Sequence, residues 1–127
     1  MGDLTKPNPP VVALNARFAD IAKLFISVRV NNLYVNDDEG RFVGAVALHD
    51  IKPYLADPSL AVLVIAKDIL REDFPRLKAD DSLADALGRF MSQEGLQRLP
   101  VIDADGRLLG SLSKNDLMLA LVEQRRR

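Results

Sequence analysis

The sequence predicts an α/β (α+β) fold that consists of two consecutive β-α-β-β-α repeats. Three observations support this prediction: an internal repeat, apolar residues at helical spacing near the start of each copy, and paired apolar strands around an acidic turn that ends in glycine. Each copy would cover one face of its sheet with helices. The remaining apolar faces are then expected to bury each other, which gives a pseudo-twofold pair.

The internal repeat has an offset of 66 residues and runs without a gap from 33–44 onto 99–110. Two of the remaining pairs, Phe42 with Leu108 and Val43 with Leu109, exchange one apolar residue for another. Agreement of this order is improbable by chance, so the chain is expected to hold two copies of one unit. The residues with an identical partner at this offset are Leu33, Val35, Asp37, Gly40, Arg41, Gly44 and Asp50.

The elements of the first repeat follow from the periodicity of its apolar residues. A short strand is expected at about Val11 to Leu14, and a helix with one apolar face follows it. No obvious capping residue precedes this helix. Its apolar positions, three and four residues apart, are Phe18, Ile21, Ala22, Phe25 and Val28.

The second repeat begins with a strand at about Arg76 to Ala79 and a helix whose start resembles a capping box. Ser82 is the expected N-cap, with Asp85 three residues later, and Gly95 is the expected terminator. After each helix the pattern predicts a strand, a tight acidic turn, a second strand and another helix. The apolar positions of this helix are Leu83, Ala86, Leu87, Phe90 and Met91.

We predict five segments along the chain, beginning with a proline-rich, extended lead-in. They are the lead-in at 1–9, the first repeat at 10–58, a linker at 59–73, the second repeat at 74–124 and a basic tail at 125–127.

Composition restricts the function classes. The 127 residues fit one compact domain, and a net charge of −1 provides no positive field for nucleic acid. The absence of cysteine removes disulfides, thiol nucleophiles and cysteine-based zinc sites. The longest apolar run, Leu60 to Ala66, is far shorter than the roughly 20 residues of a membrane-spanning helix.

The strand 99–103, the hairpin 105–110 and the turn 110–116 resemble the tandem cystathionine-beta-synthase (CBS) domain pair over about Pro9 to Val122. More specifically, 48–55 followed by 63–69 is similar to the cytosolic CBS pair of bacterial ClC-type chloride channels and transporters. The resemblance implies a regulatory module that dimerises and binds adenine nucleotides (ATP, ADP or AMP) in the cleft between repeats. It implies no obligatory cofactor, and it places the module at the cytoplasmic face of a membrane, after a channel domain.

The candidate nucleotide site of the second repeat lies where a strand turns into a helix, a place rich in unpaired amide groups. A carboxylate at Asp116 can accept two hydrogen bonds from a ribose diol, the role that the resemblance implies for it. Ser113 and Lys114 could face phosphate oxygens, with Asn115 beside them, and Gly110 allows close backbone approach. The alternative is that Ser113 and Asp116 only cap the helix.

The first repeat keeps the aspartate as Asp50 but has Ala47 in place of the serine, so its site is degenerate and Asp50 could be structural only. The first repeat is instead expected to supply the opposing wall of the second site. Val30 stands where some channel relatives have an aromatic residue that stacks on adenine. The further site candidates are Pro10, Val11, Val30, Leu33 and Pro100.

Other chemistry is disfavoured by the residues. His49 is the only histidine and has no metal-binding partner in sequence, and the acidic residues of both turns are expected there for backbone reasons. No nucleophile–base pair or phosphate loop indicates an enzyme. Two alternatives stay open: a structural dimerisation module without ligand, and a regulatory CBS pair of another transporter or of an enzyme. On the last helix, Leu117, Met118, Leu121 and Val122 are the candidate dimer residues.

Overall fold

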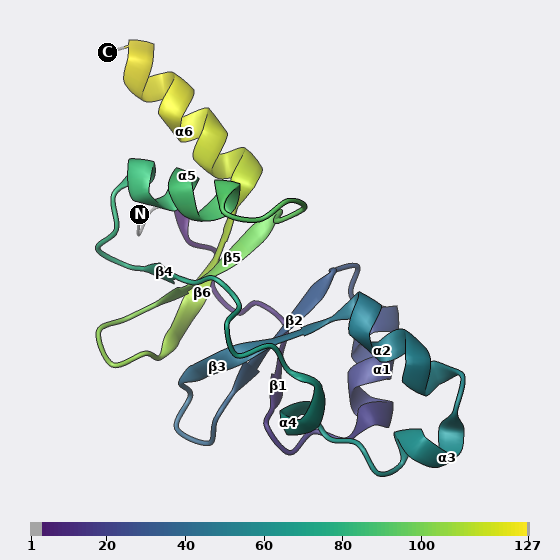
Figure 1. Cartoon of the computed structure of the whole chain (residues 1–127). Coiled ribbons are helices and arrows are strands. Elements are labelled where there is room, and N and C mark those ends of the chain that lie inside the picture. The colour runs from purple at the N-terminus through teal and green to yellow at the C-terminus, as the bar shows by residue number, and fades with distance from the viewer. Residues whose placement is uncertain (1–3, 127) are drawn as a thin grey trace. The chain divides into compact units, whose positions relative to one another are not determined.

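The computed structural model describes residues 4–126, with side chains up to Gln124. This part of the chain forms two compact units (Figure 1). The first-repeat unit is Pro10–Phe74. The second-repeat unit combines the described residues up to Pro9 with those from Pro75 onward. Each unit holds one three-stranded sheet, so the predicted pair of β-α-β-β-α repeats is confirmed.

The first-repeat unit follows the predicted order and adds two short helices. Its elements are β1 (Val11–Ala13), α1 (Phe18–Ser27), β2 (Asn32–Asn36), β3 (Phe42–Ala47), α2 (Leu48–Leu55), α3 (Pro58–Ala61) and α4 (Ala66–Ile69). The segment 59–73, described above as a linker, contains α4 and all of α3 except Pro58, and it lies within this unit.

The second-repeat unit has the same order without the two short helices. Its elements are β4 (Leu77–Lys78), α5 (Leu83–Met91), β5 (Arg98–Ile102), β6 (Leu108–Ser113) and α6 (Lys114–Arg126). Helix α6 continues directly from β6 and packs against α5 (Figure 1). The side chains of the predicted basic tail, 125–127, lie outside those that the structure describes.

The two sheets have the same register. In both, the first strand runs parallel to the second, and the second runs antiparallel to the third. Leu33 pairs with Val46 in one unit, and Leu99 pairs with Leu112 in the other, so both partners shift by the repeat offset. Each antiparallel pair also shifts register at the same place, after Val35 and after Val101.

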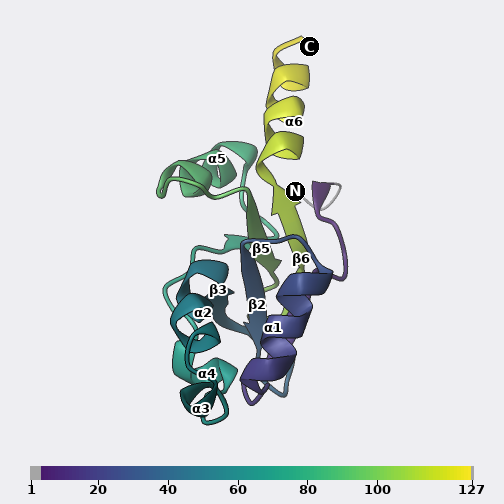
Figure 2. The ribbon, with the colours of Figure 1, turned by 90° about the vertical axis from the view of Figure 1, so that its right-hand side faces the viewer.

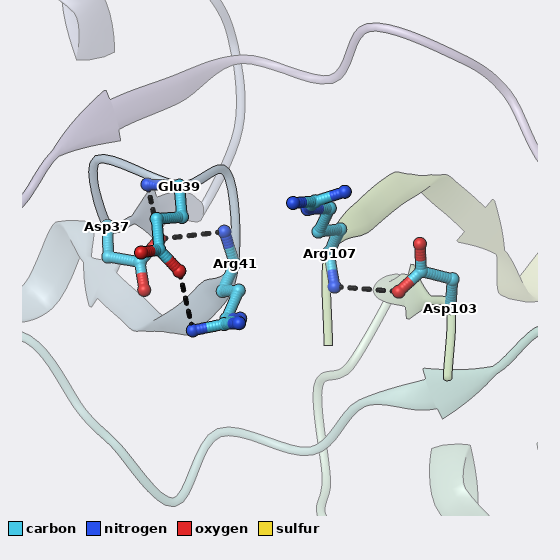
Figure 3. Close-up of polar contacts among 5 residues, drawn as sticks. All are labelled: Asp37, Glu39, Arg41, Asp103 and Arg107. Atoms are coloured by element: carbon cyan, nitrogen blue, oxygen red, sulfur yellow. Dashed lines mark hydrogen bonds and ion pairs between the residues drawn. The ribbon is translucent and has the colours of Figure 1, made fainter. Parts of the chain in front are cut away.

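In each acidic hairpin turn, an aspartate side chain accepts hydrogen bonds from backbone N–H groups of the same turn. The Asp37 Oδ1 atom accepts hydrogen bonds from the N–H groups of Glu39 and Arg41, both at 2.9 Å (Figure 3). Asp103 does the same for its own turn, accepting from the N–H of Arg107 at 3.0 Å. These bonds provide the backbone reason that the sequence offered for aspartate in both turns.

The core of the first-repeat unit lies between its sheet and its helices. Ile21 of α1, Leu33 of β2 and Ile51 of α2 are almost completely buried there. The rings of Phe18 and Tyr54 lie 5.7 Å apart and join α1 to α2, which lie next to each other beside the sheet (Figure 2). Helix α2 therefore begins at a fixed place beside β2.

The helix ends agree only partly with the prediction. Ser82 and Asp85 form the predicted capping box, with the Asp85 N–H donating to Ser82 Oγ at 3.0 Å. Helix α1 has no side-chain cap, also as predicted. Gly95 is not the terminator, because α5 already ends at Met91 and Ser92 caps it. Gly95 instead adopts a φ of 81° in the turn that follows.

Within the described residues, no helix is long and apolar enough to cross a membrane.

Candidate functional site

A fourth segment pairs with the third strand of each sheet and approaches a glycine closely. Arg71 exchanges two backbone hydrogen bonds with Ala45 of β3, at 2.8 and 3.2 Å. Lys6 exchanges two with Ser111 of β6, at 2.8 and 2.9 Å. We call residues 70–71 and 5–6 the edge segments. Because Ala45 and Ser111 are repeat equivalents, the edge segments occupy the same place in the two units.

The edge segments explain two of the identical glycines. A Cβ atom on Gly44 would lie 2.5 Å from the Arg71 carbonyl oxygen. A Cβ on Gly110 would collide with the Lys6 carbonyl oxygen and lie 2.7 Å from Thr5 Cγ2. The close approach expected at Gly110 is therefore made by the chain's own lead-in.

The second-repeat aspartate stands at the start of α6. The Asp116 N–H donates to Ser113 Oγ at 3.1 Å, so Ser113 caps the helix as the structural alternative proposed. That bond uses the backbone of Asp116 and leaves its carboxylate available. The capping role and a ligand role for this residue are therefore compatible.

An open cavity of about 320 Å³ lies beside Asp116. Lys6 of the lead-in and Glu123 of α6 also line it, together with Leu4, Leu119 and Ala120. In the described part of the chain, no ion pair is made to Asp116. The cavity thus combines an apolar wall, one ammonium group and two carboxylates.

The equivalent aspartate of the first repeat is paired. Asp50 accepts two hydrogen bonds from the Arg71 guanidinium, from Nε at 2.7 Å and from Nη2 at 2.9 Å. The hydrogen bond from Arg71 lowers the pKa of Asp50, and the same contact raises the pKa of Arg71. Helix α2 has Ala47 at its N-cap and therefore no side-chain cap. The Asp50 carboxylate already has a protein partner.

Comparison with known families agrees with this architecture. The model of the CBS domain family matches residues 1–57 and 66–123. The chain belongs to the CBS domain family. Among solved structures, the CBS pair is similar to the protein CBSX2 in complex with AMP, with 28% identity, a TM-score of 0.76 and coverage of 99% of this chain and 97% of that one. CBSX2 has also been solved from Arabidopsis thaliana, with 26% identity, a TM-score of 0.81 and coverage of 99% and 96%.

The CBS pair is also similar to a CBS pair from a proposed Mg²⁺ transporter of Shewanella oneidensis, with 25% identity, a TM-score of 0.83 and coverage of 99% of this chain and 71% of that one. Among curated proteins, it is 29% identical to a homoserine O-acetyltransferase of Methanocorpusculum labreanum. That match covers 96% of this chain but only 24% of the enzyme. The same family thus occurs in transporters and as part of larger enzymes.

The predicted site residues fall into both units. Gly110, Pro100 and the stretch Ser113–Asp116 belong to the second-repeat unit, where Lys114 is half-buried, Asn115 is exposed and Pro100 is buried. Pro10, Val11, Val30 and Leu33 belong to the first-repeat unit. The Leu33 side chain packs in the core of that unit, and Val11 is exposed. The cavity beside Asp116 contains none of these four.

Sequence reasoning missed Lys6 and Arg71, the basic residues that the edge segments bring to the two aspartates. A signal exists, because Lys6 and Arg71 stand 65 positions apart, one short of the repeat offset. The gapless alignment covers 33–44 and its partner 99–110, and neither basic residue lies within it. Only the pairing with Ala45 and Ser111 identifies them as equivalents.

Proposed function

We propose that this CBS pair is a non-catalytic regulatory module that binds an adenine nucleotide beside Asp116. One observation carries the proposal: the Asp116 carboxylate lines an open cavity and has no ion partner in the described residues, whereas Asp50 is paired. The similarity to CBSX2, solved with AMP, supports adenine nucleotide as the ligand class.

The chemistry of the cavity suits a nucleoside monophosphate. The two hydroxyl groups of a ribose can donate to the two oxygens of Asp116, and Leu119 offers apolar contact. Lys6 can attract phosphate, but Glu123 repels it. Because two carboxylates oppose few cations, AMP is expected to bind more tightly than ATP.

The test is isothermal calorimetry with AMP, ADP and ATP on the wild-type chain and on Asp116→Asn. Asparagine keeps the side-chain size but removes the charge that accepts from the diol, so AMP affinity should fall at least 10-fold. Asp105→Asn is the matched control, because this exposed turn residue carries the same charge in the same unit. Equal AMP affinity in Asp116→Asn, or no heat with any of the three nucleotides, would refute the proposal.

A structural dimerisation module is the second candidate. Its support is an exposed apolar set on α6, formed by Met118, Leu119 and Val122. The predicted dimer residues need one correction: Leu117 is fully buried and cannot contribute to an exposed face, and Leu121 is half-buried. Leu119 belongs both to this exposed set and to the lining of the cavity beside Asp116.

For the host protein we propose a membrane transport protein with this module at its cytoplasmic face. The resemblance of 48–55 and 63–69 favours a ClC-type chloride channel or transporter. The similarity to a CBS pair from a proposed Mg²⁺ transporter favours the alternative, a host of another transport class. The sequence of the full-length gene distinguishes the two directly.

A further inference from the structure

The described part of the lead-in, residues 4–9, pairs with β6 of the second-repeat unit, and we call it the strap. Two backbone hydrogen bonds between Lys6 and Ser111 join it to the strand, at 2.8 and 2.9 Å. Lys6 is exposed, and no ion pair is made to it within the described residues. The equivalent segment of the other unit has the same two bonds and adds the ion pair of Arg71 with Asp50. The strap therefore lacks the ion pair that its counterpart has.

The strap also forms one wall of the cavity beside Asp116. Leu4 and Lys6 line the cavity from the strap, and all the other lining residues belong to α6. Lys6 is the one basic side chain among the lining residues that the structure describes. A ligand that fills this cavity therefore contacts the strap and α6 together. It would lose one wall and the ammonium group if the strap left β6.

The strap continues into the first-repeat unit through a stiff stretch of chain. Four residues, 7–10, separate Lys6 from β1, and three of them are prolines, whose φ is fixed by the ring. The fourth, Asn8, has a φ of 55°, a left-handed conformation that few residues other than glycine adopt. The place of the strap on β6 is therefore tied to the entry of the chain into β1.

We propose that the pairing of the strap with β6 and the binding of a ligand beside Asp116 are coupled. The inference rests on the proposed nucleotide site and adds its regulation. A short edge pairing with exposed backbone bonds opens locally more easily than a core strand does. Because a ligand contacts Leu4 and Lys6 only while the strap is paired, binding stabilises the paired state. By linkage, displacement of the strap lowers the affinity for the ligand.

Amide hydrogen exchange, resolved by NMR, tests the coupling in the wild-type chain. AMP at about ten times its dissociation constant should slow the exchange of the Lys6 and Ser111 N–H groups about 10-fold, since only the paired state binds it. The N–H groups of Arg71 and Ala45 make the same two bonds in the other unit and are the matched control. Their exchange should not change. Equal slowing of the control amides, or of the amides throughout β5, would overturn the coupling.

Gly110→Ala tests the reverse direction. The new Cβ would collide with the Lys6 carbonyl oxygen, while every residue that lines the cavity stays the same. The Ser111 amide should therefore exchange faster without AMP, and AMP affinity measured by calorimetry should fall about 10-fold, because the contact of the Lys6 ammonium with phosphate is lost. Gly88→Ala is the control and should bind AMP as the wild type does, since nothing lies within 4 Å of its Cβ.

The two proposals fail in distinguishable ways. If AMP binds the wild-type chain but binds Gly110→Ala with equal affinity, the coupling is wrong and the nucleotide site stands. If AMP gives no heat with the wild-type chain, both proposals are overturned.

Discussion

Asp50 and Asp116 occupy equivalent positions in two units whose sheets have the same topology, yet their surroundings differ. Asp50 is bonded through both oxygens to Arg71, whereas Asp116 lines a cavity that Lys6 also lines, without an ion pair between them in the described residues. The edge segment supplies the basic residue in both units. The first-repeat unit has Arg71 in its edge segment, and its aspartate is held in an ion pair. The second-repeat unit has Lys6 in the equivalent segment, and its aspartate is available to a ligand.

The physical difference lies in the two side chains. The planar guanidinium offers a pair of N–H groups that matches a carboxylate, and it holds both in one geometry. An ammonium group is a strongly hydrated point charge on a flexible stem, so an exposed lysine gains little from a fixed pair. A repeat protein can therefore specialise its two sites by changing a residue outside the repeated motif.

The largest expected effect is a loss of stability when the glycine beside each edge segment is replaced by alanine. Gly44→Ala should lower the free energy of unfolding by about 3 kcal/mol, because the new Cβ meets the Arg71 carbonyl, and this segment is also held by the ion pair with Asp50. Gly110→Ala should cost less, about 1 kcal/mol, because no ion pair in the described residues holds Lys6 against the sheet. Urea unfolding of both variants measures the difference.

Gly88→Ala is the control for this comparison. Nothing lies within 4 Å of a Cβ at Gly88 in α5, so alanine should stabilise the chain by about 0.5–1 kcal/mol through helix propensity. If Gly110→Ala costs as much as Gly44→Ala, both edge segments are equally fixed, and the proposed difference between them is wrong.

A smaller effect is expected at the helix caps. Ser113→Ala should destabilise the chain by about 1 kcal/mol, because the Asp116 N–H loses its acceptor. Ala47→Ser should stabilise it by about 0.5 kcal/mol, since Ala47 already has the extended backbone (φ −83°, ψ 139°) of a capping residue. Thermal unfolding of both variants tests this, and a destabilising Ala47→Ser would show that the first repeat cannot accept the cap.

The features that the sequence predicted correctly depend on local rules. The order of strands and helices in each repeat, the acidic turns and the Ser82 cap all follow from side-chain periodicity and short-range hydrogen bonds. The pairing of Lys6 with Ser111 could not be predicted in this way, because no local pattern links segments so far apart. The role of Arg71 was not predicted for the same reason. The ion pair that occupies the Asp50 carboxylate was therefore not predicted either.

The error at Leu117 has a different origin. Periodicity identified apolar positions on the last helix but could not say which of them face the core and which face outward. In the structure Leu117 is fully buried, while Met118 and Val122 are about half exposed. Neighbouring residues on a helix point about 100° apart around its axis. Assigning the buried face one residue too far along the helix therefore takes a core position for a surface position.

The smallest effect concerns the pH dependence of the ion pair between Asp50 and Arg71. The pKa of Asp50 is lowered below its ordinary value of 3.8 in the folded chain, chiefly by the hydrogen bond from Arg71. The stability gained from this pair is therefore present above about pH 4 and is lost as the pH falls through the lowered folded pKa.

Asp50→Asn should accordingly cost about 0.5–1 kcal/mol at pH 7, because the pair is partly exposed, with 28% of the Asp50 side chain and 51% of the Arg71 side chain accessible. The cost should decrease as the pH falls through the lowered folded pKa of Asp50, because the wild-type carboxyl group then becomes protonated as well. Urea unfolding of wild type, Asp50→Asn and Asp116→Asn between pH 2.5 and 7, a range set around the ordinary pKa of aspartate at about 3.9, measures this. If Asp116→Asn shows the same pH-dependent loss, then Asp116 is paired in solution as Asp50 is, and the carboxylate that should receive the ribose is not available.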